Sequence, residues 1–245
     1  MEKKEQLYEG KAKKVYATED PEKLIVSYKD DATAFNGLKK GTISGKGAIN
    51  NRMSNFLMGM LEKHGVPTHL VEELNDRETV VKKVTIVPLE VIIRNISAGS
   101  FSKRYGVAEG IVFDEPTIEF SYKNDDLGDP LINSYHALAL KLATKEEIET
   151  IKALAFQVDD VLKAYFLGLG IELVDFKLEF GRLADGTVGW VNWDDYLVSR
   201  TDYTQGEDYS TATKEGFVNQ KGYSSPTGYL LWICLLYTSP SPRDC

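Results

Sequence analysis

Hydrophobic and polar residues alternate most strictly between residues 174 and 181. The hydrophobic positions are Val174, Phe176, Leu178 and Phe180. The positions between them are charged: Asp175, Lys177 and Glu179. Because successive side chains of a strand point to opposite faces, this pattern predicts a strand with one buried and one charged face. Acid, base and acid about 7 Å apart suit a polyanion bound with a divalent cation, although an edge strand with self-compensating surface charges is the alternative.

Similar alternation near the N-terminus predicts an antiparallel sheet. Residues 7–16 are expected to form two strands joined by a tight turn, and residues 24–28 a third strand. The turn at residues 10–13 combines small residues with lysines, so a phosphate could lie against its backbone N–H groups. An ordinary basic hairpin is the alternative.

Two stretches show helical spacing instead. Hydrophobic residues recur from Ile49 to Leu61, and the polar residues at the start of that helix are interpreted as caps: Asn50, Asn51 and Arg52. Thr144 and Glu147 form a capping box before a long amphipathic helix. Residues 30–47 are rich in glycine and are expected to form a loop. Their resemblance to a phosphate-binding P-loop fails on spacing.

β-Branched residues dominate 79–84 and 86–93, which predicts two strands, or one strand with a break at Pro88, that cross between lobes. Arg94 follows the second strand, and a loop of small residues that includes Ser100 comes next. A guanidinium beside hydroxyl and backbone donors is typical of an anion site. Residues 121–130 predict an acidic loop rich in turns, and residues 181–188 predict a hairpin turn.

Composition narrows the function further. The net charge of the 245 residues is −8, so we expect no general attraction to nucleic acid or to an acidic membrane. The apolar run at 229–237 is too short to span a bilayer. Both cysteines, Cys234 and Cys245, lie at the C-terminal end, which fits a reducing cytoplasm. The three histidines have no metal-ligand spacing.

Five segments that occur in order carry a resemblance to a known family. They are Tyr8-Glu9-Gly10-Lys11-Ala12-Lys13, Gly45-Lys46-Gly47 with Asn50-Asn51, Val91-Ile92-Ile93-Arg94-Asn95 with Ala98-Gly99-Ser100, Lys123-Asn124-Asp125-Asp126 with Asp129-Pro130, and Asp175 to Gly181. Together they closely resemble the phosphoribosylaminoimidazole-succinocarboxamide synthase (SAICAR synthetase) family over residues 5–188. Each segment is weak by itself, but five in register are specific.

The resemblance implies an α+β, two-lobed ATP-grasp- and kinase-like fold. An antiparallel N-terminal β lobe would span residues 1–82 and a larger α/β lobe residues 83–188. It also implies a carbon–nitrogen ligase of purine biosynthesis that uses ATP and Mg²⁺. Such an enzyme joins L-aspartate to the carboxylate of an imidazole ribonucleotide, and the resemblance is compatible with a homodimer.

The resemblance also implies roles for particular residues. ATP would be held by Gly10, Lys11, Ala12, Lys13, Ile86 and Lys123. The ribonucleotide phosphate would be bound by Arg94 and Ser100. The imidazole carboxylate would be positioned by Asp175, Lys177 and Asp129, and Mg²⁺ would be ligated by Glu179.

The C-terminal part departs from the family pattern. An Asp-Glu-x-Ser-Pro-Asp segment, which would supply a second metal carboxylate, is expected after residue 188 and does not occur. Residues 189–245 are therefore expected to be a disordered or artefactual tail, and the last twelve residues resemble translated adaptor sequence. Two alternatives to the ligase follow: a catalytically impaired ATP-binding remnant of it, and a kinase-like phosphotransferase.

Overall fold

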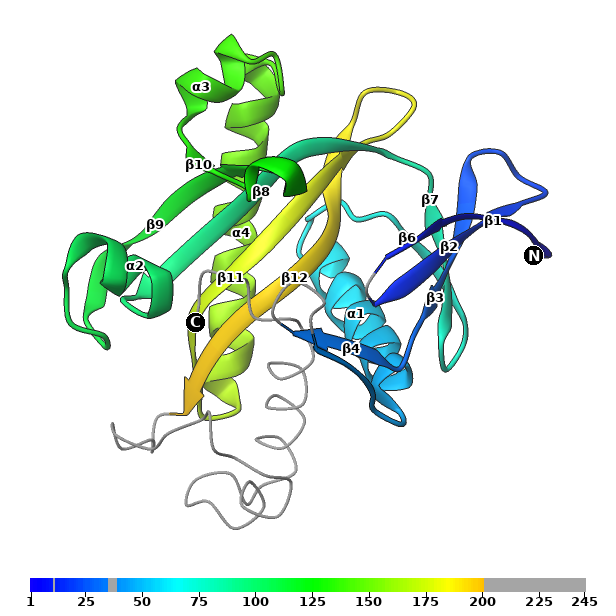
Figure 1. The fold of residues 1–245 in the computed structure, drawn as a ribbon, viewed down its shortest axis with the longest axis horizontal. Coiled ribbons are helices and arrows are strands. Elements are labelled where there is room, and N and C mark those ends of the chain that lie inside the picture. The colour runs from blue at the N-terminus through cyan, green and yellow to red at the C-terminus, as the bar shows by residue number, and fades with distance from the viewer. Residues whose placement is uncertain (11, 35–38, 201–245) are drawn as a thin grey trace.

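The computed structural model describes residues 1–200, except residues 11 and 35–38. In this part of the chain, two five-stranded antiparallel sheets form two lobes, and the long helices α1 and α4 lie against them (Figure 1). The expected α+β, two-lobed organisation is confirmed. Two cysteines and the final apolar run lie outside the described residues.

The first sheet forms the N-terminal lobe. Its strand order is β1 (Lys3–Glu9), β2 (Lys13–Thr18), β3 (Lys23–Tyr28), β7 (Glu78–Lys82) and β6 (Leu70–Asn75). The three strands predicted at the N-terminus are therefore confirmed. The outer strand β1 is exposed along its whole length, whereas Ile25 and Val80 in the middle of the sheet are buried.

The second sheet forms the larger lobe. Its strand order is β10 (Leu131–Ile132), β9 (Val112–Tyr122), β8 (Thr85–Ile96), β11 (Ile171–Arg182) and β12 (Val188–Arg200). The shorter helical elements are α2 (Gly99–Tyr105), a 3-10 turn (Asp125–Leu127) and α3 (Ser134–Ala139). The strands expected at 79–84 and 86–93 are β7 and β8, which belong to different sheets, so the chain crosses between lobes there.

Helix α4 (Lys145–Gly168) covers one face of the second sheet (Figure 1). It begins at the predicted capping box, where Thr144 and Glu147 bond to each other's backbone N–H groups. Its hydrophobic stripe packs on the apolar face of β11, and the core includes Phe176, Leu178 and Phe180, each no more than 1% exposed. The predicted apolar face therefore exists from Phe176 to Phe180 and orients the charged face away from α4, whereas Val174 is buried in a separate cluster with Ile96 and Ala98.

The two lobes are joined through helix α1 (Lys46–Lys63), which packs on the first sheet. Phe56 of α1 contacts Tyr165 of α4 with ring centroids 5.5 Å apart. Gln157 of α4 donates a 2.7 Å hydrogen bond to the carbonyl of His64 at the end of α1. These contacts fix the position of the first sheet relative to the second.

Two expectations for the segment before and within α1 were wrong. Residues 30–47 contain a hairpin, β4 (Asp31–Ala34) paired with β5 (Lys39–Thr42), rather than a continuous loop. Asn51 does not cap the helix; it is fully buried inside it. Its amide donates to the carbonyl of Asn75 and its oxygen accepts from the hydroxyl of Thr79, so it joins α1 to β6 and β7.

The start of α1 is occupied by an internal carboxylate. Asp30 accepts hydrogen bonds from the backbone N–H groups of Gly45 and Gly47 and forms a two-pronged ion pair with Arg77. A P-loop would present such N–H groups to a phosphate, but here Asp30 uses them. The structure therefore supports the exclusion of a P-loop in this segment.

The Asp30 contacts predict a pH dependence of stability. Arg77 lowers the pKa of Asp30 from 3.8 to about 2, so the carboxylate stabilises the fold above the pKa of the unfolded chain. After allowance for solvent screening of the partly exposed Arg77, we expect Asp30 to contribute about 1–2 kcal/mol to the free energy of unfolding. This contribution is lost as the pH falls from about 4 to 2. Chemical denaturation of Asp30→Asn should show lower stability at pH 7 and a weaker pH dependence in that window. An unchanged profile would contradict the assignment.

Glycine substitutions in α1 should have opposite effects. A Cβ at Gly47 would lie 2.5 Å from the carbonyl oxygen of Tyr28, whereas a Cβ at Gly59 would meet nothing within 4 Å. Gly47→Ala should therefore lower the free energy of unfolding by about 1–3 kcal/mol. Gly59→Ala should raise it by about 0.5–1 kcal/mol. Equal effects of the two substitutions in urea denaturation would show that the close approach is unimportant.

The boundary expected at residue 188 coincides with the start of β12. Residues 189–200, which the sequence assigns to a disordered or artefactual tail, form most of this strand, and it pairs with β11 from Val188 to Arg200. The described backbone of residues 189–200 therefore has strand conformation, and the assignment of residues 189–245 to a tail stays a prediction. Residues 201–245 lie outside the described residues, and the division into lobes at residue 82 stays a prediction.

Candidate functional site

Strand β11 pairs with strand β8, so the charged residues of β11 share one face of the sheet with residues of β8. In the antiparallel register, Asp175 is opposite Arg94, Lys177 is opposite Ile92, and Glu179 is opposite Glu90. All six residues belong to the central part of the second sheet. Register therefore collects side chains from residues 90–94 and 175–179 on the sheet face that α4 leaves uncovered.

The three charged residues in the middle of β11, Asp175, Lys177 and Glu179, each have a partner of opposite sign. Asp175 pairs with Arg94, and Glu179 pairs with Lys123. The ammonium nitrogen Nζ of Lys177 lies 2.9 Å from Oε1 of Glu90. The acid, base, acid pattern is thus compensated across strands by β8 and by the end of β9, rather than along β11 itself.

Glu90 is the site residue that sequence reasoning missed. It is a buried acid, 7% exposed, in the middle of a strand of hydrophobic residues. An isolated charge at such a position is unfavourable unless it is paired, so the charged residue inside the run at 86–93 was the available signal.

Arg94 is more enclosed than a surface anion site would be. It is 5% exposed, its Nη1 donates to the carbonyl of Ala98 at 3.1 Å, and its guanidinium lies 5.4 Å from the ring centroid of Phe101. Its buried Nε has no hydrogen-bond partner among the described residues. Ser100 lies in the first turn of α2, two residues after Ala98, whose carbonyl accepts the hydrogen bond from Arg94.

The acidic loop at 121–130 borders the same face. The backbone N–H of Lys123 donates to the carbonyl of Pro88, which places this lysine beside β8. Asp129 accepts a 2.8 Å hydrogen bond from the backbone N–H of Asn124 and has a positive φ of 45°. The loop is therefore folded on itself by Asp129, and it delivers Lys123 to Glu179.

The predicted nucleotide-binding turn belongs to the first sheet. Gly10 donates from its backbone N–H to the carbonyl of Lys13, and Lys29 donates to the carbonyl of Ala12. Lys29 also lowers the pKa of Glu9 by hydrogen bonding. The prediction for Lys11 lies outside the described residues. Ile86, expected near adenine, lies on β8 of the second sheet and is 40% exposed.

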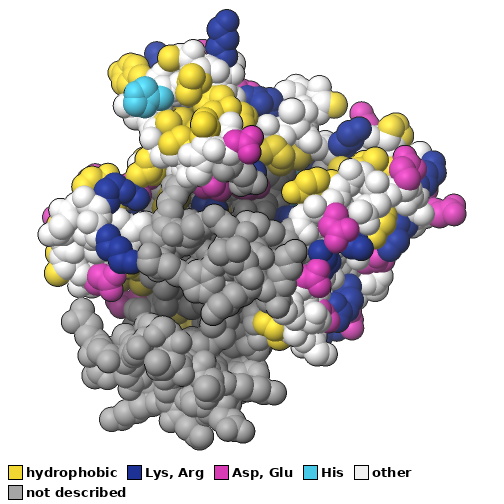
Figure 2. Space-filling view, viewed as in Figure 1, with side chains coloured by type: hydrophobic (Ala, Val, Ile, Leu, Met, Phe, Trp, Pro, Cys, Tyr) yellow, Lys and Arg dark blue, Asp and Glu magenta, His cyan; other side chains and the backbone are white. Residues whose placement is uncertain are grey.

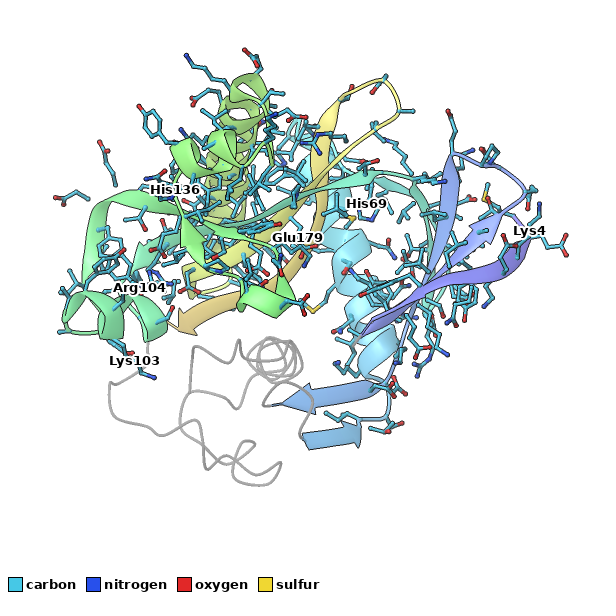
Figure 3. The ribbon with its side chains drawn as sticks, turned by 45° about the horizontal axis from the view of Figure 1, so that its top comes forward. Lys4, His69, Lys103, Arg104, His136 and Glu179 are labelled. Carbon is cyan, nitrogen blue, oxygen red and sulfur yellow. The ribbon has the colours of Figure 1, made fainter. Side chains whose placement is uncertain are left out.

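Glu179 lies apart from the charged side chains at the two ends of the molecule. Figure 3 shows Glu179 near the middle of the molecule, Lys4 at the far end of the first sheet, and Lys103 with Arg104 at α2. Arg104 forms a 2.7 Å ion pair with Glu119. Basic and acidic side chains are interspersed over the first sheet in Figure 2.

Glu179 is the residue of this face that could ligate Mg²⁺. Among the described residues, no three His, Cys, Asp or Glu side chains converge closely enough to hold a metal ion by themselves. Mg²⁺ commonly takes only one or two protein carboxylates and completes its shell with phosphate oxygens and water. The Glu179 carboxylate fits that arrangement as an oxygen ligand. In the described chain, no helix is both long and apolar enough to span a membrane.

Solved structures define the class of protein. The structure resembles phosphoribosylaminoimidazole-succinocarboxamide synthase from Ehrlichia chaffeensis, with a TM-score of 0.77 and 44% identity, covering 81% of this chain and 86% of that one. It also resembles a SAICAR synthetase solved in complex with ADP, with a TM-score of 0.76 and 42% identity, covering 80% and 84% of the two chains. The fold is therefore of the two-lobed, ATP-grasp-like ligase class.

Sequence relationship gives the family. The family model of SAICAR synthetase matches residues 6–192. Phosphoribosylaminoimidazole-succinocarboxamide synthase of Lachnoclostridium phytofermentans is 68% identical over 185 residues, which cover 76% of this chain and 79% of that protein. The chain belongs to the SAICAR synthetase family. The resemblance stated for residues 5–188 is confirmed, and it extends four residues into the segment assigned to the tail.

Proposed function

We propose that this chain is the ATP-dependent ligase that joins L-aspartate to 5-amino-1-(5-phosphoribosyl)imidazole-4-carboxylate, with formation of SAICAR, ADP and phosphate in purine biosynthesis. Family membership over residues 6–192 is the observation that carries the proposal. The charged face of β8 and β11 supports it, because it combines a carboxylate for a cation with cationic groups for anionic substrates. A remnant without activity and a kinase-like phosphotransferase are not favoured by this relationship.

ATP is assigned to the turn between β1 and β2 of the first sheet and to the start of β8. In this assignment Gly10, Lys11, Ala12 and Lys13 bind its phosphates, the backbone near Ile86 meets adenine, and Lys123 reaches the phosphates from β9. The related enzyme in complex with ADP supports nucleotide use by this fold. Small residues at 10 and 12 would allow phosphate oxygens to approach the backbone N–H groups.

The ribonucleotide is assigned to the other end of β8. Arg94 and Ser100 would bind its phosphate, because a guanidinium fork and a hydroxyl at a strand end form a specific phosphate site. Asp175, Lys177 and Asp129 would position the imidazole carboxylate and its neighbours. Lys177 supplies the positive charge, which a carboxylate needs when it is taken out of water.

Mg²⁺ would be held by Glu179 together with phosphate oxygens of the nucleotide. When bound, the cation withdraws charge from the phosphoryl oxygens. The contribution of the chain is the buried position of Glu179 on a rigid strand, with Lys123 beside it to balance its charge.

The chemistry follows from the poor reactivity of a carboxylate toward an amine. We expect a carboxylate oxygen of the imidazole to attack the γ-phosphorus of ATP, so that ADP leaves and an acyl phosphate forms. The aspartate amine then attacks the acyl carbon, and phosphate leaves with the former carboxylate oxygen. Lys177 would orient the carboxylate in the first step, which removes much of the entropic part of the barrier.

Release of ADP tests this assignment. The full chain should release ADP at its full rate only when ATP, the ribonucleotide and aspartate are all present, because the acyl phosphate must be consumed before the site can turn over. A coupled ADP assay with each substrate omitted in turn gives the comparison. Equal ADP release with and without aspartate would favour a phosphotransferase and contradict the ligase.

Two further expectations accompany this function. We propose a cytoplasmic location, which fits a chain whose first 233 residues contain no cysteine. The family resemblance is compatible with a homodimer, and light scattering of the purified chain tests for one.

A further inference from the structure

We propose that Glu90 is a positioning residue for Lys177, holding the lysine ammonium where it meets the carboxylate of the substrate. The inference rests on the role of Lys177 in the proposed function. Glu90 itself need not touch the substrate, because its effect passes through the ion pair with Lys177, which joins Nζ and Oε1 at 2.9 Å.

Glu90 is a charged residue in a buried, hydrophobic part of β8. Its immediate neighbours on β8, Leu89 and Val91, are core residues that are 1% and 0% exposed. The side chain of Glu90 is 9% exposed, and that of Lys177 is 18% exposed. Burial of a carboxylate is costly, and a hydrophobic residue would serve the sheet better if packing were its only task. We therefore infer that the ion pair serves to hold the Lys177 ammonium in a particular position.

The register explains why Lys177 turns toward β8. On its own strand Lys177 is flanked by Asp175 and Glu179, which share its face about 7 Å away on either side. Asp175 pairs with Arg94 and Glu179 pairs with Lys123, so both neighbouring carboxylates have a cation. Glu90 is opposite Glu179 and therefore diagonal to Lys177. A flexible four-carbon side chain is thus directed by a carboxylate on the adjacent strand.

The ion pair between Lys177 and Glu90 also reduces the repulsion between Glu90 and Glu179. Glu90 and Glu179 face each other across β8 and β11, and two like charges opposite each other destabilise a sheet. Lys177 neutralises one carboxylate and Lys123 the other. Removal of the Glu90 acceptor removes this ion pair, so we expect the Lys177 ammonium to shift from the position in which it meets the substrate carboxylate.

Two substitutions separate hydrogen bonding from packing. Glu90→Met keeps the length of the side chain but has no oxygen, whereas Glu90→Gln keeps an acceptor for the Lys177 ammonium. By calorimetry on the full chain, Glu90→Met should weaken binding of 5-amino-1-(5-phosphoribosyl)imidazole-4-carboxylate about 10-fold. Glu90→Gln should restore binding to within about threefold of the unaltered chain.

The ligand and a second substitution provide the decisive controls. The same ribonucleotide without its carboxylate should bind the Glu90→Met variant and the unaltered chain within about twofold, since Lys177 would have no carboxylate to meet. In a Lys177→Met background, Glu90→Met should cause no further loss beyond about twofold. Arg182→Met, which breaks the ion pair of β11 with Glu147 of α4, is the matched control and should leave binding unchanged.

The outcomes distinguish this inference from the function on which it rests. If the unaltered chain does not bind the ribonucleotide, the proposed function fails. If it binds and Glu90→Met binds equally well, or if Glu90→Met weakens both ribonucleotides and ADP alike, Glu90 has no positioning role. Additive losses from Glu90→Met and Lys177→Met would overturn the inference in the same way.

Discussion

Replacement of Glu179 by glutamine is expected to lower turnover at least about 100-fold, which corresponds to about 3 kcal/mol of transition-state stabilisation. The amide keeps the shape of the side chain but removes the charge that would ligate Mg²⁺. Glu179 is 6% exposed and pairs with Lys123, so its loss also leaves an ammonium without this partner at the same face. Steady-state ADP release at increasing Mg²⁺ concentration measures the effect.

Substitution on the opposite face of the same strand provides the control. Arg182→Met breaks an ion pair with Glu147 but lies against α4, so turnover and Mg²⁺ dependence should stay close to those of the unaltered chain. ADP binding in the presence of a chelator should be similar in Glu179→Gln and the unaltered chain. A Glu179→Gln variant with an unaltered Mg²⁺ dependence would exclude Glu179 as the metal ligand.

Arg94→Lys is expected to weaken ribonucleotide binding by about 1–3 kcal/mol and to affect ATP binding much less. Lysine keeps the positive charge but cannot donate at once to a phosphate, to Asp175 and to the carbonyl of Ala98 in the planar geometry of a guanidinium. Because Arg94 is buried, we also expect lower thermal stability. Calorimetry with both ligands, below the unfolding temperature of the variant, gives the comparison.

Arg52→Lys is the matched change in an exposed ion pair. Arg52 pairs with Asp76 at the surface of the first lobe, where both side chains are about two-thirds exposed. Such pairs contribute little, so this variant should bind both ligands normally. A loss of ATP affinity in Arg94→Lys as large as the loss of ribonucleotide affinity would place Arg94 in a different pocket.

Strict local patterns were sufficient for the regular elements. The alternation at residues 174–180 predicted β11, and the box of Thr144 and Glu147 predicted the start of α4. In each case a single face buries hydrophobic residues, so the period in the sequence matches the period of the structure. The three N-terminal strands were also predicted, although β1 is exposed along its whole length and buries no face.

Elements stabilised mainly by backbone hydrogen bonds were not predictable in this way. Strands β4 and β5 have the sequences Asp-Ala-Thr-Ala and Lys-Lys-Gly-Thr, which show no hydrophobic face, and they pair through their ladder. Asn51 resembled a cap because asparagine favours helix ends. Its bonds to residues 24 and 28 positions away depend on how α1 docks on the sheet, which no local pattern contains.

The ion-pair partners on neighbouring strands could not be predicted either, because they also depend on how distant segments pack together. Arg94 and Asp175 are 81 residues apart, and Glu90 and Lys177 are 87 apart, so only the register of β8 against β11 brings them together. The sequence indicated which residue types carry charge on one face. It could not indicate that Asp175, Lys177 and Glu179 each pair with a residue outside β11, which is the property that makes Glu90 part of the site.

The most direct test of the ligase mechanism follows an oxygen atom. The full chain is supplied with ATP, aspartate and ribonucleotide whose imidazole carboxylate carries ¹⁸O, and the phosphate released is analysed by mass spectrometry. If the carboxylate is activated by phosphorylation, each phosphate should carry one ¹⁸O from the carboxylate, and the product should contain the aspartate nitrogen in a new amide bond. Amide product accompanied by phosphate without ¹⁸O would contradict the account.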